Sequence, residues 1–196
     1  MSRQSGDHEE VLADQFSHVS AMETAESGPP VDQWDPPFMG DLDIHVARDG
    51  RWFYEGREMQ RQALKALFAS IMRLESDGEY YLVTPVEKFR IRVEDAPFIA
   101  HTLEVVNEGS VEQVLWLHTN MDEQLAIGDR HPLTTYRDPE SGEQMPYVLV
   151  RRNLQARIER NAFYHLVEHA EQRSIDGRTH LGVISQGRFF SLGEAE

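Results

Sequence analysis

Two amphipathic helix patterns, each followed by an Asp-Gly turn and short strand-like runs, constrain the fold of this chain more than any other feature. In residues 59–74 and again in residues 162–170, apolar side chains recur three and four positions apart, which is the spacing of one helix face. Asp77-Gly78 follows the first pattern and Asp176-Gly177 follows the second. Most of the remaining chain consists of short strand-like runs, so we expect an α+β fold with antiparallel or mixed sheets.

The two helix patterns can be aligned without a gap at an offset of 99 positions. The identical pairs in this alignment are Arg61 and Arg160, Ala63 and Ala162, Leu67 and Leu166, Asp77 and Asp176, Gly78 and Gly177, and Leu82 and Leu181. The order of helix, turn and strands is also the same. We interpret this as an internal duplication, which predicts two small domains with one main helix each. Turn chemistry shared by two unrelated segments stays open as the alternative.

Hairpins are predicted in both halves of the chain. Residues 41–47 alternate polar and apolar side chains, Asp49-Gly50 provides a tight turn, and residues 51–54 return as the second strand. Between the helix patterns, residues 98–106 and 111–118 flank a four-residue turn cluster that contains glycine. Such clusters connect the strands of a hairpin, so we expect a second strand pair there.

A further pair of strands is predicted after the first helix pattern, over residues 80–84 and around residues 88–93. In the second strand Lys88, Arg90 and Arg92 alternate with apolar residues. Alternate residues of a strand point to the same side, so the three cations are expected to lie on one face of the sheet.

The N-terminal region differs from the rest of the chain in composition. Residues 1–43 contain ten acidic residues against one arginine, a net charge of −9, and prolines come in pairs at positions 29–30 and 36–37. We interpret this region as a solvated tail. The near-helical spacing of its apolar residues leaves a docking helix open as the alternative; these are Val11, Leu12, Phe16 and Val19. The predicted organisation is a disordered acidic arm over residues 1–35, an N-terminal α+β domain over 36–97 and a C-terminal α+β domain over 98–196.

Composition excludes several classes of protein. The chain has no cysteine, which excludes a disulfide scaffold, thiolate metal sites and thiol catalysis. Its net charge of −15 argues against a general nucleic-acid binder, which needs a basic surface. No apolar run reaches the roughly eighteen residues of a membrane span, and the N-terminus lacks the basic and apolar regions of a secretory signal. We therefore expect a cytoplasmic protein.

Two local motifs suggest hydrolytic chemistry. Residues 165–169, His-Leu-Val-Glu-His, fit the H-x-x-E-H pattern of a group of zinc peptidases. Both histidines lie off the apolar face of the helix, however, and only 27 residues follow His169 to supply the third ligand that catalytic zinc needs. Ser185 stands in G-x-x-S-x-G, one residue longer than a nucleophile elbow and without a following helix. We interpret it as a serine at a strand end.

A cluster of arginines precedes the second helix pattern and suggests an anion site. Arg151, Arg152, Arg157 and Arg160 surround Asn153, which is a favourable residue for capping a helix N-terminus. The free amide groups and the dipole of such a helix end favour a bound anion. Arginines that cover a solvated helix face and pair with nearby carboxylates are the alternative.

Six segments together resemble the DUF1285 family of uncharacterised bacterial proteins, from about residue 30 to the end of the chain. They are residues 40–43 (GDLD), 49–52 (DGRW), 82–88 (LVTPVEK), 95–98 (DAPF), 163–167 (FYxLV) and 181–190 (LGVxSxGxFF). The most specific part is the segment 84–88 followed by 95–98. The resemblance implies two domains related by duplication, a C-terminal domain similar to pleckstrin-homology-like folds, a nucleotide-based ligand in a cleft between the domains, and a role in signalling.

From the residues and the resemblance together, we expect a ligand-binding or signalling module without enzymatic activity that binds a nucleotide-like anion between its two domains. The expected polar contacts are Lys88, Arg90, Arg151, Asn153 and Arg157, and the expected wall residues are Thr84 and Trp52. We expect no catalytic residue, no cofactor and no metal. A protein-interaction adapter, whose acidic arm docks on a basic partner, and a metal-dependent hydrolase are the alternatives.

Overall fold

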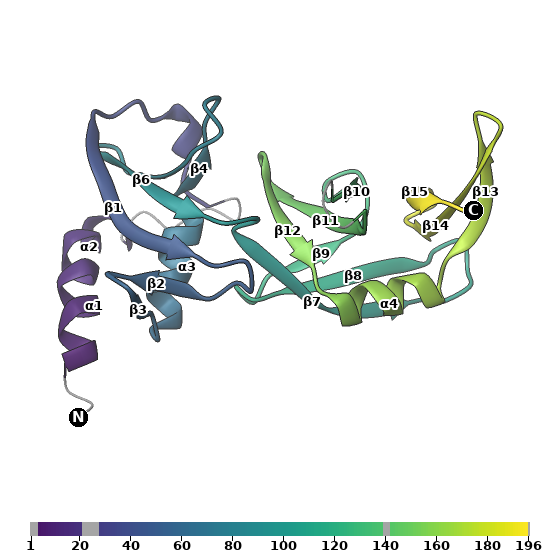
Figure 1. The fold of residues 1–196 in the computed structure, drawn as a ribbon, viewed down its shortest axis with the longest axis horizontal. Helices are drawn as coiled ribbons and strands as arrows, with labels where there is room; N and C mark the ends of the chain where they lie inside the picture. Colours follow the sequence, from purple (N-terminus) through teal and green to yellow (C-terminus); the bar gives the residue numbers. More distant parts are fainter. Residues whose placement is uncertain (1–3, 21–27, 139–141, 196) are drawn as a thin grey trace. The chain divides into compact units, whose positions relative to one another are not determined.

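The computed structural model of the chain describes residues 4–20, 28–138 and 142–195. The chain divides into two compact units, unit 1 over Met1–Asp95 and unit 2 over Ala96–Glu196. Each unit combines β-sheet with few helices (Figure 1), so the chain is a two-domain α+β protein. Among the described residues, none of the helices has both the length and the apolar character needed to cross a membrane.

Unit 1 is built around one six-stranded mixed sheet, sheet A, with strand order β3-β2-β1-β6-β5-β4. Only β1 and β6 pair in parallel, and the other neighbours are antiparallel. The elements are α1 (Gln4–Gln15), α2 (Ser17–Ser20), the 3₁₀ helix η1 (Val31–Gln33), β1 (Phe38–Val46), β2 (Trp52–Tyr54), β3 (Arg57–Glu58), α3 (Gln62–Ser70), β4 (Met72–Leu74), β5 (Tyr80–Val83) and β6 (Lys88–Val93).

The hairpin of β1 and β2 confirms the first predicted strand pair. Val46 lies opposite Trp52, and the turn between them contains Asp49 and Gly50. Gly50 has φ of 84°, a conformation that favours glycine, and the Asp49 carboxylate accepts a hydrogen bond from the Arg51 amide at 3.1 Å. The turn therefore forms for the local reason that the sequence indicates.

The first predicted helix is shorter than its pattern of apolar residues. α3 ends at Ser70, and residues 72–74 form strand β4, whereas the helix was expected to extend over residues 59–74. Met72 lies opposite Leu82 of β5, in the hairpin that turns through Asp77-Gly78. A helix that continued to residue 74 would lose the backbone hydrogen bonds between β4 and β5. Met72 is fully buried in β4, and its apolar character alone does not separate a helix from a strand.

The N-terminal region differs from the disordered arm that was expected over residues 1–35. Residues 4–20 form helices α1 and α2, and Val31 begins η1; residues 1–3 and 21–27 of that arm lie outside the described residues. Leu12, Phe16 and Val19 are fully buried in unit 1. These three residues thus form a face that packs on their own domain, whereas Val11 is 67% exposed.

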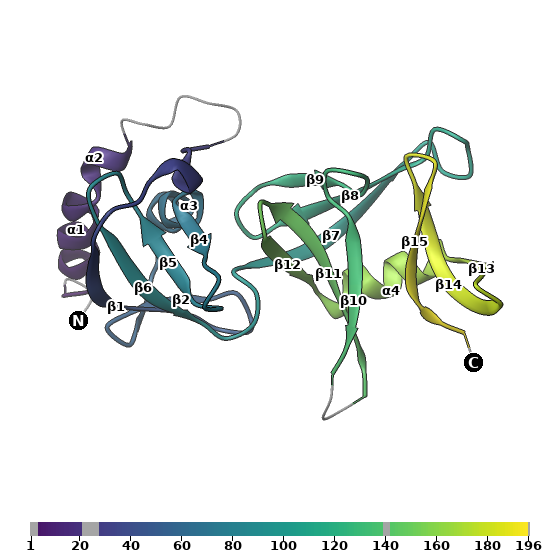
Figure 2. The ribbon, with the colours of Figure 1, turned by 90° about the horizontal axis from the view of Figure 1, so that it is seen from above.

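Unit 2 contains a strongly curved mixed sheet, sheet B, with strand order β10-β11-β12-β7-β8-β9, and a separate antiparallel sheet C with order β13-β14-β15. The elements are β7 (Phe98–Val106), β8 (Val114–Thr119), β9 (Gln124–Ala126), β10 (Leu133–Arg137), β11 (Gln144–Arg151), β12 (Leu154–Ile158), α4 (Arg160–Glu168), β13 (Glu171–Ile175), β14 (Arg178–Ser185) and β15 (Arg188–Glu194). Helix α4 packs beside β7 (Figures 1 and 2). This half-barrel with an adjacent helix has the architecture of a pleckstrin-homology-like domain.

The order helix, then three antiparallel strands, occurs in both units. In unit 1 α3 precedes β4, β5 and β6, and in unit 2 α4 precedes β13, β14 and β15. The Asp-Gly turns lie between the first two strands of each set, and Gly78 and Gly177 have φ of 83° and 79°. The three strands belong to sheet A in unit 1 but form a sheet of their own in unit 2. The internal duplication therefore stays a prediction.

Candidate functional site

The three predicted cations of β6 lie on one face of sheet A. Arg90 is opposite Tyr81 of β5 and Asp41 of β1, and residues directly opposite one another share a face of the sheet. Lys88 and Arg92 flank Arg90 at two-residue spacing and belong to the same face. The alternation of the sequence thus predicted the placement of these side chains.

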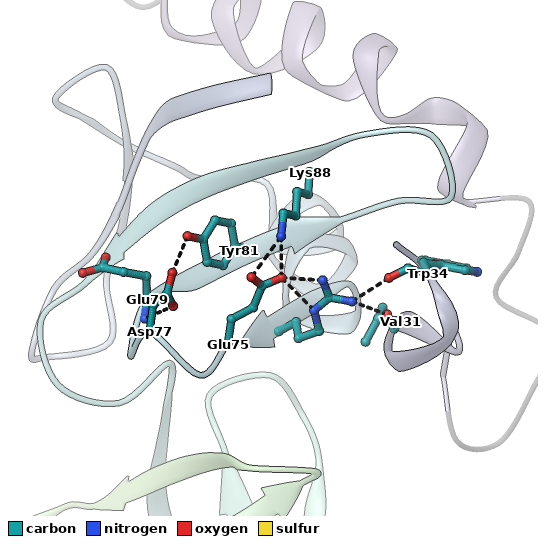
Figure 3. Close-up of polar contacts among 8 residues, drawn as sticks. Val31, Trp34, Glu75, Asp77, Glu79, Tyr81 and Lys88 are labelled. Atoms are coloured by element: carbon teal, nitrogen blue, oxygen red, sulfur yellow. Dashed lines mark hydrogen bonds and ion pairs between the residues drawn. The ribbon is translucent and has the colours of Figure 1, made fainter. Parts of the chain in front are cut away.

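Lys88 belongs to a cluster of polar groups that are only partly exposed (Figure 3). Its Nζ lies 2.9 Å from both carboxylate oxygens of Glu75, and Arg73 also pairs with that carboxylate. Burial alone would raise the pKa of Glu75, but the hydrogen bonds from Lys88 and Arg73 outweigh it and lower the pKa. Arg73 also donates to the carbonyl oxygens of Val31 and Trp34, both at 2.8 Å. The cluster therefore connects strands β4 and β6 to the η1 segment.

Arg90 is paired with Asp41 through two parallel hydrogen bonds. Its Nε and Nη2 atoms lie 2.8 and 2.9 Å from the two carboxylate oxygens. The hydrogen bond to Arg90 lowers the pKa of Asp41. Both side chains are exposed, so an anionic ligand could approach Arg90 only in competition with Asp41.

The two predicted wall residues of unit 1 are completely buried. The Thr84 hydroxyl donates to the Glu87 carbonyl at 3.1 Å and accepts from the amides of Val86 and Glu87, which holds the turn between β5 and β6. Trp52 has no exposed surface and stacks on Phe68 of α3 at 6.5 Å between ring centroids. Both side chains thus have packing roles within unit 1.

The arginine cluster of unit 2 is arranged on strands rather than at the start of a helix. Residues 154–158 form β12 and the helix begins at Arg160, with Glu159 at its N-cap position. The prediction that Asn153 caps this helix is therefore wrong, because Asn153 lies in the turn between β11 and β12. The apolar residues at positions 154, 156 and 158 alternate with polar ones and are buried on one face, which is a strand pattern.

Arg151 is engaged within its own domain. Its Nη1 lies 2.9 and 2.7 Å from the two carboxylate oxygens of Glu123. The guanidinium group also lies over the ring of Phe98, 5.1 Å from the centroid. These contacts link β11 to the turn before β9 and to β7, which is a structural role.

Arg157 lines a cavity of about 400 Å³ in unit 2. The cavity is formed by the chain that enters β11, by the end of β12 and by the first turns of α4. Its apolar lining consists of Met145, Pro146, Ile158, Phe163 and Tyr164, and its charged lining of Arg157, Arg160, Glu143 and Glu159. Volumes of this order are typical of small-molecule sites, in which a mostly apolar wall carries a few polar groups.

The charged groups of this cavity are two guanidinium groups, two carboxylates and the start of helix α4. The N-cap residue Glu159 makes no side-chain capping hydrogen bond, and the dipole of α4 favours negative charge at this end. The side chain of Arg160 is 71% exposed, and its Nη2 atom lies 3.9 Å from a carboxylate oxygen of Glu143. This distance is at the outer limit of an ion pair. An anion can therefore reach Arg160 by displacing a weak contact.

The sequence indicated only part of this cavity. Arg157 was among the predicted contacts, whereas Met145, Pro146 and Tyr164 were not. Tyr164 is 57% exposed and lies outside the apolar face of its helix, and an aromatic residue in such a position was an available signal. Met145 and Pro146 come near α4 only through the pairing of β11 with β12, which the sequence does not specify.

The two histidines of the H-x-x-E-H motif lie close together on and just after α4. Their ring centroids are 5.3 Å apart, and His169 Nδ1 is 3.1 Å from a carboxylate oxygen of Glu108. Within residues 4–20, 28–138 and 142–195, no group of three or more His, Asp or Glu side chains is placed to hold a metal ion. The motif thus lacks a third ligand in the part of the chain that the structure describes.

The fold and the cavity define a class of two-domain α+β proteins with a pleckstrin-homology-like C-terminal domain. A model of the domain of unknown function DUF1285, N-terminal domain, matches residues 29–96, and a model of its C-terminal domain matches residues 97–192. The chain belongs to the DUF1285 family, as the resemblance predicted.

Two solved structures support this assignment. The crystal structure of a DUF1285 family protein from Silicibacter pomeroyi DSS-3 is 42% identical, with a TM-score of 0.78 over 92% of this chain and 94% of that chain. The crystal structure of a DUF1285 family protein from Shewanella baltica OS155 is 26% identical, with a TM-score of 0.50 over 65% of this chain and 91% of that chain. No curated protein matches the chain.

Proposed function

We propose that this chain is a non-enzymatic ligand-binding module with a signalling role, and that its C-terminal domain binds a nucleotide-like anion in the Arg157 cavity. The observation that carries the proposal is the composition of that cavity, which combines two guanidinium groups, the start of α4 and the rings of Phe163 and Tyr164, alongside the carboxylates of Glu143 and Glu159. An anionic group and a flat ring are the two parts of a ligand that such a lining would recognise.

The arginines supply the contacts for a phosphate group. A guanidinium group offers paired donors that match phosphate oxygens, and Arg157 and Arg160 both line the cavity. The amide groups in the first turn of α4 add further donors. Tyr164, which is largely exposed, offers a ring on which a base can stack.

Of the contacts predicted from the sequence, this proposal uses Arg157. It locates the ligand within unit 2 rather than between the two domains, because all the residues that line the cavity belong to unit 2. The proposal does not use the cations of sheet A, because Lys88 and Arg90 are each held by a carboxylate at two points. A ligand there would have to replace two existing hydrogen bonds at each cation.

A thermal-shift screen followed by calorimetry tests the proposal. The purified full chain is screened against nucleoside mono-, di- and triphosphates, cyclic dinucleotides and nicotinamide dinucleotides. A ligand at a hundredfold excess over its Kd stabilises the native state by about 2.7 kcal/mol. We expect at least one ligand in this panel to raise the melting temperature by several degrees.

Variants of the cavity then locate the bound ligand. Arg157→Glu and Tyr164→Ala should each reduce affinity at least about tenfold, a loss on the order of 1.4 kcal/mol, and Tyr164→Ala removes only an exposed ring. Arg173→Glu is the matched control, because Arg173 is an exposed arginine of β13 that does not line the cavity. A panel without a hit, or a hit with unchanged affinity in both cavity variants, would overturn the proposal.

A further inference from the structure

The N-terminal segment binds unit 1 in the manner of a peptide ligand. We call residues 8–19 the docking segment, and we call the surface that receives it the groove; the groove is formed by residues 60–61, Phe68 of α3 and Phe89 of β6. Figure 2 shows α1 and α2 along the side of unit 1, next to α3. The contacts between segment and groove are of two kinds, one charged and one apolar.

The buried charged contact is made by Glu9 at the start of α3; His8 of the same segment lies 3.0 Å from the Glu55 carboxylate at the surface. One carboxylate oxygen of Glu9 accepts a hydrogen bond from the Gln60 amide at 2.9 Å, and the other accepts from the Arg61 amide at 3.1 Å. Helix α3 has no side-chain cap of its own and no acidic residue in its first turn. Glu9 is 5% exposed, so the docking segment supplies a buried carboxylate that α3 lacks.

The apolar contacts follow Glu9 at positions +3, +7 and +10. Leu12, Phe16 and Val19 are 1%, 0% and 0% exposed. The ring of Phe16 packs edge-on against Phe68 at 5.1 Å and against Phe89 at 6.1 Å between centroids. Apolar anchors at helical spacing are the pattern by which amphipathic helices bind grooves, and Glu9 adds a charged contact to this pattern.

The docking segment lies outside the part of unit 1 that the family model covers, while the groove lies inside it. The family model of the N-terminal domain covers residues 29–96, which include the residues of the groove but none of the segment. Helix α1 has only 12 residues, and isolated helices of that length are marginal in water. The helix therefore depends on the groove for its stability.

We propose that this groove is a binding site for an amphipathic helix of a partner protein, with an acidic residue followed by Leu at +3 and Phe at +7, and that the docking segment is its tethered occupant. A tethered ligand acts at an effective concentration on the order of millimolar. The segment thus keeps the groove closed to weak partners, and a partner helix binds by replacing it. This interaction surface lies in unit 1 and does not depend on a ligand in the Arg157 cavity.

Peptide binding to the full chain tests the proposal. The probe is a fluorescent synthetic peptide of residues 4–20, and the proteins are the wild-type chain and the full-length variants Phe16→Ala and Glu9→Ala, which weaken the tethered segment but leave the groove intact. We expect the peptide to bind both variants about tenfold or more tightly than the wild type. A peptide that itself carries Phe16→Ala is the matched control and should not bind.

Each other outcome decides against the proposal. Absence of peptide binding to both variants, with urea midpoints showing that at least one is folded, would show that the groove is not a site for a separate helix. Equal binding of the two peptides would place the contact elsewhere, and a concentration-dependent dimer of the wild-type chain would make a second copy the occupant. Hydrogen exchange gives an independent measurement on the unmodified chain. Amides of residues 9–19 should exchange faster than those of α3, and equal protection would contradict an exchangeable segment.

Discussion

Lys88 holds Glu75 at two points, with its Nζ 2.9 Å from each carboxylate oxygen. Arg73 approaches the same carboxylate, and all three side chains are less than a quarter exposed. Two cations share one anion, and Lys88 also lies over the ring of Tyr81 at 4.9 Å. The carboxylate of Glu75 is therefore the group on which the polar contacts of this part of sheet A depend (Figure 3).

Replacing Glu75 with glutamine should destabilise unit 1. The neutral amide keeps one acceptor oxygen and puts an NH2 donor in place of the other, so Lys88 and Arg73 are left partly buried without a counter-charge. We expect the free energy of unfolding of unit 1 to fall by about 1–3 kcal/mol at pH 7. Urea unfolding in a Trp116→Phe background measures this, because the remaining tryptophans, Trp34 and Trp52, lie in unit 1.

The pH dependence gives the same prediction a second readout. The pKa of Glu75 is lowered below its ordinary value of 4.5, so its contribution is complete above pH 4.5 and is lost as the pH falls through the folded-state pKa. The variant should therefore lose less stability than the wild type on acidification. Glu58→Gln, which breaks an exposed pair with Arg51 at 3.6 Å, is the control and should leave the midpoint almost unchanged. Identical acid profiles for Glu75→Gln and wild type would contradict the assignment.

Local turn chemistry and alternation made part of this fold predictable. Asp49-Gly50 and Asp176-Gly177 each connect antiparallel strands, because the conformation that such a turn needs is set by the residues of the turn itself. Alternation placed Lys88 and Arg90 on one face for the same local reason. The pairing of Lys88 with Glu75 was not predictable, since it depends on which strands become neighbours in sheet A.

The two errors have different physical origins. Residues 151–157 carry arginines and a capping residue and were assigned to a helix entry, yet β11 and β12 pair there. The acidic composition of the N-terminal region indicated a solvated arm, but the amides of Gln60 and Arg61 hydrogen-bond to Glu9. The first error is a missed local hairpin, because Arg151 pairs with Leu154 across a two-residue turn. The second depends on hydrogen bonds between residues about fifty positions apart, which no local pattern brings together.

Tyr81 should ionise at unusually high pH. Its hydroxyl donates to Asp77 at 2.8 Å, and this hydrogen bond, together with burial, raises the pKa of Tyr81 to about 12. Its contribution to stability is therefore complete below its ordinary pKa of 10.0 and is lost as the pH rises through about 12. Absorbance titration of the phenolate should show a step near pH 12 that Tyr81→Phe abolishes.

Asp77→Asn is the matched variant for the tyrosine titration. It removes the negative charge beside the phenol but keeps a side chain of the same size, so the pKa of Tyr81 should move back toward 10.0. If the high-pH step stays in place in Asp77→Asn, the hydrogen bond is not its cause.

Ser185 should be important for stability rather than for chemistry. Its hydroxyl is completely buried, donates to the Ile127 carbonyl at 2.6 Å and accepts from the Leu115 amide at 3.0 Å. It therefore connects β14 of sheet C to β8 and to the residue after β9. Ser185→Ala would leave the Leu115 amide buried without this acceptor.

We expect Ser185→Ala to lower the free energy of unfolding of unit 2 by about 1–3 kcal/mol. Hydrogen exchange gives the local readout, because the amide of Leu115 should exchange faster in the variant while β5 of unit 1 keeps its protection. Ser174→Ala is the control, since Ser174 is exposed on β13 and its change should fall within about 0.5 kcal/mol. Position 185 thus needs a hydroxyl group because its hydrogen bonds join sheet C to sheet B. Unchanged protection of the Leu115 amide in the alanine variant would show that this junction does not depend on the hydroxyl.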